Sequence, residues 1–211
     1  MPLTIDLWSD PICPWCWIGK HRLEQALKQA GLEQHARWNF HAFELGPRDA
    51  APAPVTDMLR KKYGGSAQDI RDMFKRVEDL GAELGLKFEF ERSIAAPTFT
   101  AQRLVKAAAP SGRAGALLEA MHLAHFTKGL DLSDTSVLQA LAVEAGLPAA
   151  ETAAVLGGDA WTLEVEQDEE RAAAYDISGV PFFVFQGRLA LGGAQPVETF
   201  VKALEQARNI E

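Results

Sequence analysis

The stretch D-P-I-C-P-W-C-W-I-G, residues 10–19, contains the only two cysteines in this chain of 211 residues. Cys13 and Cys16 are separated by one proline and one tryptophan, and more residues of both types lie close by. Pro14 suits the first turn of a helix, because a residue there needs no backbone N–H donor. The spacing therefore predicts a helix that starts at Cys13 and carries Cys16 one turn later.

Segments with strand patterns lie on both sides of this helix. Apolar residues alternate along residues 3–8, and residues 36–43 are rich in aromatic side chains. Between them, apolar residues recur at helical spacing up to Gly31. The first part of the chain therefore predicts a strand, the cysteine-bearing helix and a second strand, which together form a βαβ unit of about the minimum size.

The middle of the chain has a different pattern. Over residues 55–175, apolar residues recur at helical spacing in about six segments, which Gly, Pro, Ser or Asp separate. A strand is indicated only around Lys87–Glu91. No fixed repeat period relates the segments, so a solenoid is not expected.

Strand patterns return near the C-terminus. Residues 180–187 and 188–193 predict a hairpin that turns near Gln186 and Gly187. Residues 197–207 predict a closing helix with apolar side chains on one face.

The order of these elements predicts an α/β fold in which the two ends of the chain complete one sheet. Residues 1–50 and 170–211 would form this domain, and residues 51–169 would form a helical domain inserted into it.

A Cys-x-x-Cys pair allows three interpretations: two buried apolar thiols, half of a metal site or a redox dithiol. His122 and His125 lie three residues apart on a predicted helix and could complete a zinc site. Redox chemistry is favoured, because the unpaired N–H groups at a helix start stabilise a thiolate. An exposed Cys13 would attack a partner's disulfide, and a buried Cys16 would then resolve the mixed disulfide.

The stretch W-S-D-P-I-C-P-W-C-W-I-G-K, residues 8–20, resembles the active site of the DsbA-like branch of the thioredoxin superfamily, most closely the FrnE-like cytoplasmic members. The similarity continues through F-E-L at 43–45, A-Q-R-L at 101–104, and G-V-P-F-F-V-F followed by G-G-A-Q in the last third. The resemblance implies a thioredoxin-like fold with a helical domain inserted after the first βαβ unit. It also implies a thiol–disulfide oxidoreductase that acts on protein or small-molecule disulfides.

The resemblance assigns further site residues. Pro181, which follows Val180, matches a proline that has a cis peptide bond beside the cysteines in thioredoxin-like folds. The backbone of Val180 is therefore expected to pair with an extended substrate chain. Asp6 resembles a buried acid that moves protons for the inner thiol, although this chain has one extra residue before the cysteines.

Apolar side chains surround the cysteines, among them Ile12, Pro14 and Trp15. An apolar collar at a reactive thiol suits the binding of unfolded or extended peptide, so these three residues are predicted to contact substrate. The same collar also suits a different function, that of a non-catalytic peptide-binding or chaperone module.

A second enzyme class resembles this chain, namely the 2-hydroxychromene-2-carboxylate isomerases and kappa-class glutathione transferases. These enzymes activate bound glutathione with a serine near the position of Cys13. The presence of both Cys13 and Cys16 favours disulfide exchange instead. No bound organic cofactor and no bound metal are expected, and glutathione is a candidate co-substrate.

Charge and hydropathy limit the partners and the compartment. The formal net charge of -8 argues against a nucleic-acid partner. No apolar run approaches the roughly 20 residues of a membrane span, and the first ten residues do not resemble a secretory signal. A cytoplasmic protein is therefore expected, with disulfide- or thiol-bearing proteins or peptides as partners. The sequence leaves the oligomeric state open.

Overall fold

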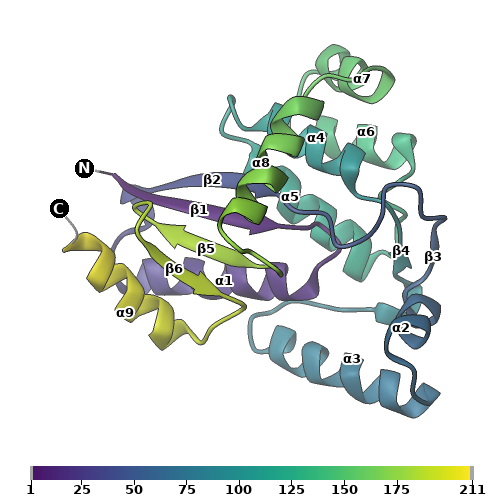
Figure 1. Ribbon diagram of the computed structural model, residues 1–211, viewed down its shortest axis with the longest axis horizontal. Helices are drawn as coiled ribbons and strands as arrows, with labels where there is room; N and C mark the ends of the chain where they lie inside the picture. The colour runs from purple at the N-terminus through teal and green to yellow at the C-terminus, as the bar shows by residue number, and fades with distance from the viewer. Residues whose placement is uncertain (1, 210–211) are drawn as a thin grey trace.

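A four-stranded sheet with the order β2-β1-β5-β6 lies at the centre of the computed structural model, which describes residues 2–209 (Figure 1). β1 (Leu3–Ser9) and β2 (Ala36–Ala42) are parallel. β5 (Phe182–Phe185) pairs antiparallel with β1, and β6 (Leu189–Gly192) pairs antiparallel with β5. The two ends of the chain therefore share one sheet, as predicted.

Two helices, α1 (Pro14–Gln29) and α9 (Val197–Arg208), pack against each other on one face of this sheet (Figure 1). The alternation along β1 turns Ile5 and Leu7 toward them, and both side chains are completely buried. The core of this layer is apolar and includes Leu3, Ile5, Leu7, Leu23, Leu27, Phe183, Phe185, Phe200 and Leu204.

Seven α-helices lie between β2 and β5 in the described chain, one more than the approximate number predicted. They are α2 (Val55–Tyr63), α3 (Ala67–Ala82), α4 (Phe99–Ala108), α5 (Ala114–His122), α6 (Thr135–Glu144), α7 (Ala149–Gly157) and α8 (Thr162–Ala174). A π-helical turn (Leu123–Thr127) extends α5. Helices α4 to α7 share an apolar core of their own, while α4, α5 and α8 contact β2. None of the helices in residues 2–209 is long and apolar enough to cross a membrane.

The prediction of a strand around Lys87–Glu91 is wrong. These residues lead into a short 3₁₀ helix (Phe90–Arg92), which is followed by the short strand β4 (Ile94–Ala95), and β4 pairs with β3 (Ala53–Pro54). The alternating pattern has another cause. Phe88 and Phe90 are both buried in an aromatic cluster, and the N–H of Glu89 donates to the carbonyl of Phe126 at 2.7 Å.

The C-terminal hairpin is confirmed. It turns at Gln186 and Gly187, which both have left-handed backbone conformations, with φ angles of 52° and 66°. Phe185 pairs with Leu189, so the loop has three residues, 186–188, and such angles are typical of short hairpin loops. The predicted division between domains at residues 169 and 170 falls inside α8, which continues without a break from Thr162 to Ala174.

Candidate active site

The loop after β1 places Cys13 at the N-terminus of α1. Cys13 has extended backbone angles, with φ −93° and ψ 111°, and the helix begins at Pro14 directly after it. The Sγ atom of Cys13 accepts a hydrogen bond from the backbone N–H of Cys16, with a sulfur–nitrogen distance of 3.3 Å. The sulfur therefore takes the place of a helix-capping oxygen, where a negative charge is stabilised. The predicted helix start is confirmed.

The two thiols differ less in exposure than the sequence suggested. Cys16 is completely buried, but Cys13 is itself only 3% exposed, because neighbouring side chains and the backbone of Val180 close around it. Cys13 lines a cavity, and Cys16 does not. Burial, and then the hydrogen bond with Cys13, raise the pKa of the Cys16 thiol well above its usual value. Cys16 is therefore a neutral thiol at neutral pH.

The segment before β5 lies against the cysteines, as predicted. The Val180–Pro181 peptide bond is cis, and the thiol of Cys13 donates to the carbonyl oxygen of Val180 at 3.5 Å. Pro181 packs on α1 at Gly19, where an added Cβ atom would lie only 2.9 Å from Cγ of the proline. The glycine that follows the cysteine pair thus allows the segment before β5 to approach the helix.

A cavity of about 460 Å³ opens beside Cys13, a volume typical of small-molecule sites. Ile12, Pro14, Trp15 and Val180 line it, whereas Pro181 does not. The remaining wall comes largely from α2, α3 and the aromatic cluster, and includes Met58, Leu59, Tyr63, Met73, Phe74, Phe90 and Phe126. The sequence indicated that α2 and α3 were amphipathic helices but not that they would face the cysteines.

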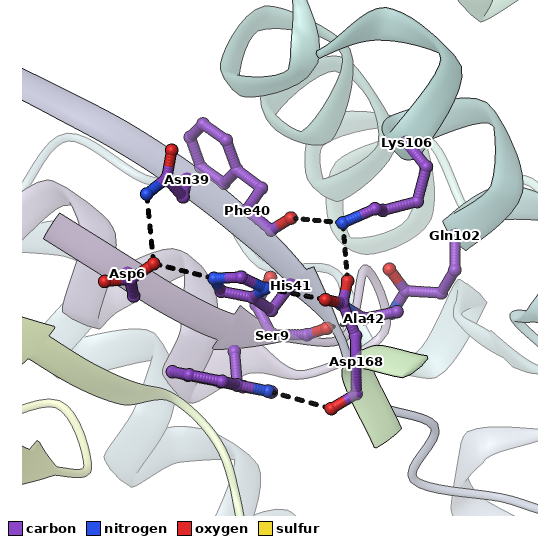
Figure 2. Close-up of polar contacts among 10 residues, drawn as sticks. Asp6, Ser9, Asn39, Phe40, His41, Ala42, Gln102, Lys106 and Asp168 are labelled. Carbon is purple, nitrogen blue, oxygen red and sulfur yellow. Dashed lines mark hydrogen bonds and ion pairs between the residues drawn. The ribbon is translucent and has the colours of Figure 1, made fainter. Parts of the chain in front are cut away.

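Asp6 does not lie beside the cysteines, and this prediction is wrong. It alternates with the residues that face α1, so its carboxylate lies on the opposite face of the sheet (Figure 2). There it accepts hydrogen bonds from Asn39 at 3.0 Å and from Nε2 of His41 at 2.8 Å. Although burial opposes them, these bonds lower the pKa of Asp6 below its usual value. Asp6 is therefore an ionised structural residue.

His41 and Asp168 extend this polar network toward the helices (Figure 2). Nδ1 of His41 donates to Asp168 at 2.7 Å, and Lys106 of α4 donates to the other oxygen of Asp168 at 2.6 Å. Burial alone would lower the pKa of His41, but its hydrogen bonds with Asp168 and Asp6 raise the pKa above its usual value. The network thus contains two carboxylates and two cations, and it joins the sheet to α4 and α8.

Asp10 is the buried acid next to the dithiol, and sequence reasoning missed it. Its side chain is completely buried, and its oxygens accept hydrogen bonds from the N–H of Ile12 at 3.0 Å, the N–H of Leu45 at 2.8 Å and the hydroxyl of Thr98 at 3.2 Å. Its carbonyl accepts from the N–H of Cys13 at 3.0 Å. Burial raises the pKa of Asp10 to about 6. The sequence signal, an aspartate just before Pro11, indicated only a turn.

The zinc alternative is not supported by the geometry. Residues 2–209 contain no group of three or more His, Cys, Asp or Glu side chains that could hold a metal ion. His122 and His125 are both buried, and burial lowers their pKa values to about 3 and about 4. Neither ring nitrogen of His125 has a hydrogen-bond partner in the described part of the chain.

Trp17 anchors α1 to α5. It is 2% exposed, stacks on His122 and Phe126, and donates its indole N–H to Glu119 at 2.7 Å. Lys20 also donates to this carboxylate, at 2.9 Å. The helix that carries the cysteines is thereby fixed to the helical insertion.

Comparisons with known proteins identify the family of this chain. A model of the DSBA-like thioredoxin domain matches residues 4–205. The crystal structure of the probable DsbA oxidoreductase SCO1869 from Streptomyces coelicolor is 36% identical, with a TM-score of 0.94, over 99% of this chain and 91% of that chain. Protein YwbO of Bacillus subtilis (strain 168) is 27% identical over 97% of this chain and 96% of its own. A 2-hydroxychromene-2-carboxylate isomerase is 15% identical, with a TM-score of 0.67 over 96% and 95% of the two chains, and is similar in fold. Since the family match spans nearly the whole chain, this protein belongs to the DsbA-like thioredoxin family of oxidoreductases.

Proposed function

We propose that this protein is a thiol–disulfide oxidoreductase that uses Cys13 and Cys16 on the disulfides of proteins, peptides or small molecules. The main support is the arrangement of the two thiols within one helical turn. The sulfur of Cys13 caps the helix and faces a cavity, whereas Cys16 lies behind it with its N–H on that sulfur. A helix-capping thiol that lines a cavity, with a second thiol behind it, suits a two-step exchange.

In the proposed reaction, the thiolate of Cys13 attacks one sulfur of the substrate disulfide and displaces the other as a thiolate. Cys16 then attacks the sulfur of Cys13, loses its proton to the departing thiolate or to solvent, and releases the second substrate thiolate. The substrate gains two electrons, and the dithiol becomes a disulfide. Glutathione, or a protein thiol, would restore the dithiol by the same chemistry in reverse.

The backbone of Val180 is proposed to dock an extended substrate chain, since its carbonyl already meets the thiol of Cys13. The active-site stretch also supports the FrnE-like, cytoplasmic assignment. In a reducing compartment the dithiol would rest reduced and act chiefly as a disulfide reductase.

The test is exchange with insulin and with glutathione disulfide as substrates. Cys13→Ser is expected to abolish exchange, because it removes the attacking sulfur. Cys16→Ser is expected to accumulate mixed disulfides on Cys13, which mass spectrometry of the non-reduced protein would detect. Trapping on Cys16 in the Cys13→Ser protein, with none in the Cys16→Ser protein, would show that the roles are reversed.

A glutathione-dependent isomerase is the second candidate, because the cavity has the size of a small-molecule site and an isomerase shares the fold. Cys16→Ser separates the two functions. An isomerase needs only the residue at position 13 to activate glutathione, so its turnover would survive the substitution, whereas disulfide exchange would stop after the first step. A chaperone module would suppress aggregation even with both cysteines replaced.

A further inference from the structure

The cavity beside Cys13 differs in charge from the rest of the chain. The protein carries a formal net charge of -8, yet no aspartate or glutamate lines the cavity. The only basic side chains in the lining are those of Lys62, from α2, and Arg76, from α3. The lining of the cavity thus has two basic groups and no carboxylate, although the buried Asp10 lies next to the dithiol outside this lining.

Neither cation is neutralised by the protein. No carboxylate in residues 2–209 forms an ion pair with Lys62 or Arg76, although Lys75, next to Arg76 on α3, is paired with Asp79 at 2.8 Å. The Lys62 ammonium lies 5.5 Å from the centre of the Tyr63 ring. Both charges are thus available to a ligand in the cavity.

The rest of the cavity is apolar. Half of the exposed large apolar side chains in the described chain lie at its mouth, namely Trp15, Leu45, Tyr63 and Met73. Single exposed apolar residues are ordinary, but a group that converges on one cavity marks a binding site. The flexible side chain of Met73 can adapt to ligands of different shape.

We propose that the preferred substrates of this site are small organic disulfides in which an apolar, preferably aromatic, body carries an anionic group such as a carboxylate. The apolar body would fill the cavity between α2 and α3, and the anion would face Lys62 and Arg76 while the disulfide meets Cys13. The volume of about 460 Å³ fits a small molecule rather than a long protein segment. This inference rests on the proposed disulfide exchange and adds its substrate class.

The experiment compares three disulfide probes that react with the reduced protein. Dithiobis(nitrobenzoate) is aromatic and anionic, dithiodipyridine is aromatic and neutral, and dithiodiglycolate is anionic without an apolar body. Each rate is divided by the rate of the same probe with dithiothreitol, which corrects for intrinsic reactivity. At low salt, this corrected rate is expected to be about tenfold higher for dithiobis(nitrobenzoate) than for the other two probes. The difference should shrink as salt screens the charges.

The variants test which residues cause this preference. Lys62→Gln combined with Arg76→Gln is expected to remove the gain of the aromatic anion while leaving the rate with dithiodipyridine unchanged. Lys61→Gln is the matched control, because Lys61 lies on the same helix but outside the cavity lining. The proposed substrate class would be overturned if the wild-type protein showed no preference for dithiobis(nitrobenzoate), or if the double variant kept that preference. Either result would leave the proposed disulfide exchange intact. Absence of reaction with all three probes would overturn both proposals.

Discussion

At the level of single residues, Asp6 and Asp10 show how the surroundings of a carboxylate set the direction of its pKa shift. Asp6 accepts bonds from His41 and Asn39 and has a lowered pKa, although burial opposes this. Asp10 is completely buried, and its pKa rises to about 6. At neutral pH both are ionised, but only the charge of Asp10 acts on the dithiol.

Asp10→Asn is expected to change the pH dependence of the resolving step. Burial and the bond with Cys13 are the main reasons for the raised pKa of Cys16, and the charge of Asp10 raises it further. Wild type should therefore show an inflection near pH 6 in the rate of resolution, where Asp10 titrates. The variant should lack the inflection and resolve faster above it. Stopped-flow release of thiol from a preformed Cys13 mixed disulfide measures both.

Asp6→Asn provides the control, since it removes a carboxylate on the other face of the sheet. It should lower stability and leave the inflection in place. If Asp10→Asn instead slows resolution above pH 6, Asp10 is a proton acceptor for Cys16 rather than a charge that opposes its ionisation.

His125→Leu is expected to stabilise the protein, most of all in acid. Both ring nitrogens of His125 are buried without a partner, which costs about 1–3 kcal/mol at neutral pH. Burial lowers the pKa of His125 to about 4, whereas an unfolded histidine titrates near 6.5. The unfolded state therefore takes up a proton first as the pH falls below 6.5, and at pH 5 this costs about 2 kcal/mol more. Urea unfolding at pH 5 and pH 7.5 measures the gain. His35→Gln, at an exposed position, should change neither value.

The positions of the site residues could be predicted from the sequence where they depend on contacts between neighbouring residues in the chain. Cys13 at the helix start follows from Pro14 and the spacing to Cys16. The burial of Asp10 could not be predicted, because it depends on Leu45 and Thr98, which lie far away in the sequence.

At the scale of elements, α8 connects the helical insertion to the sheet. Its residue Asp168 accepts hydrogen bonds from His41, from Lys106 and from the backbone N–H of Ala42 at 3.0 Å, and its carbonyl accepts from Trp8 at 3.1 Å. One side chain thus ties α8 to β2 and α4. This makes α8 part of the sheet layer as much as of the insertion.

Asp168→Asn is expected to lower the free energy of unfolding by about 3 kcal/mol, because it leaves the buried His41 and the half-buried Lys106 with one carboxylate fewer. Burial alone would raise the pKa of Asp168, but hydrogen bonds from His41 and Lys106 lower it below its usual value. The stabilisation from Asp168 is therefore present above the pKa of an unfolded aspartate, near 4, and is lost as the pH falls through the lower pKa of the folded state. Chemical denaturation at pH 7 tests the size of the effect. Glu166→Gln, on the exposed side of the same helix, should cost less than 1 kcal/mol.

Elements with a strong internal pattern were predictable, and those that depend on distant partners were not. The hairpin at Gln186 and Gly187 carries its own turn signal. Residues 87–91 alternate like a strand, but their aromatic side chains fill a cluster with Phe126, and no strand pairs with them in the described chain.

At the scale of the whole molecule, two apolar cores meet at Phe40. This β2 residue packs against the core of the sheet layer and against the core of α4 to α7. It lies so close to α5 that a Cβ added to Gly115 would be 3.0 Å from its ring. The sequence predicted both units, but the contact that joins them depends on the packing of α5 against the sheet.

Phe40→Ala is expected to lower stability by about 3 kcal/mol and to uncouple the two cores. Unfolding followed at probes in each core by hydrogen exchange should then show two transitions instead of one. Phe200→Ala, which removes a ring from the sheet core alone, should lower stability and keep a single transition. Coincident unfolding of both cores in Phe40→Ala would show that other contacts couple them.

The placement of two tryptophans gives the dithiol an optical readout. Trp15 lies at the mouth of the cavity and is 37% exposed, so its emission should respond when the cavity is filled. Trp17 lies next to Cys16 with its indole held on Glu119, where a change from thiol to disulfide should alter its quenching. Replacing one indole at a time by phenylalanine would assign the two signals. Occupancy and oxidation could then be followed in real time without a label.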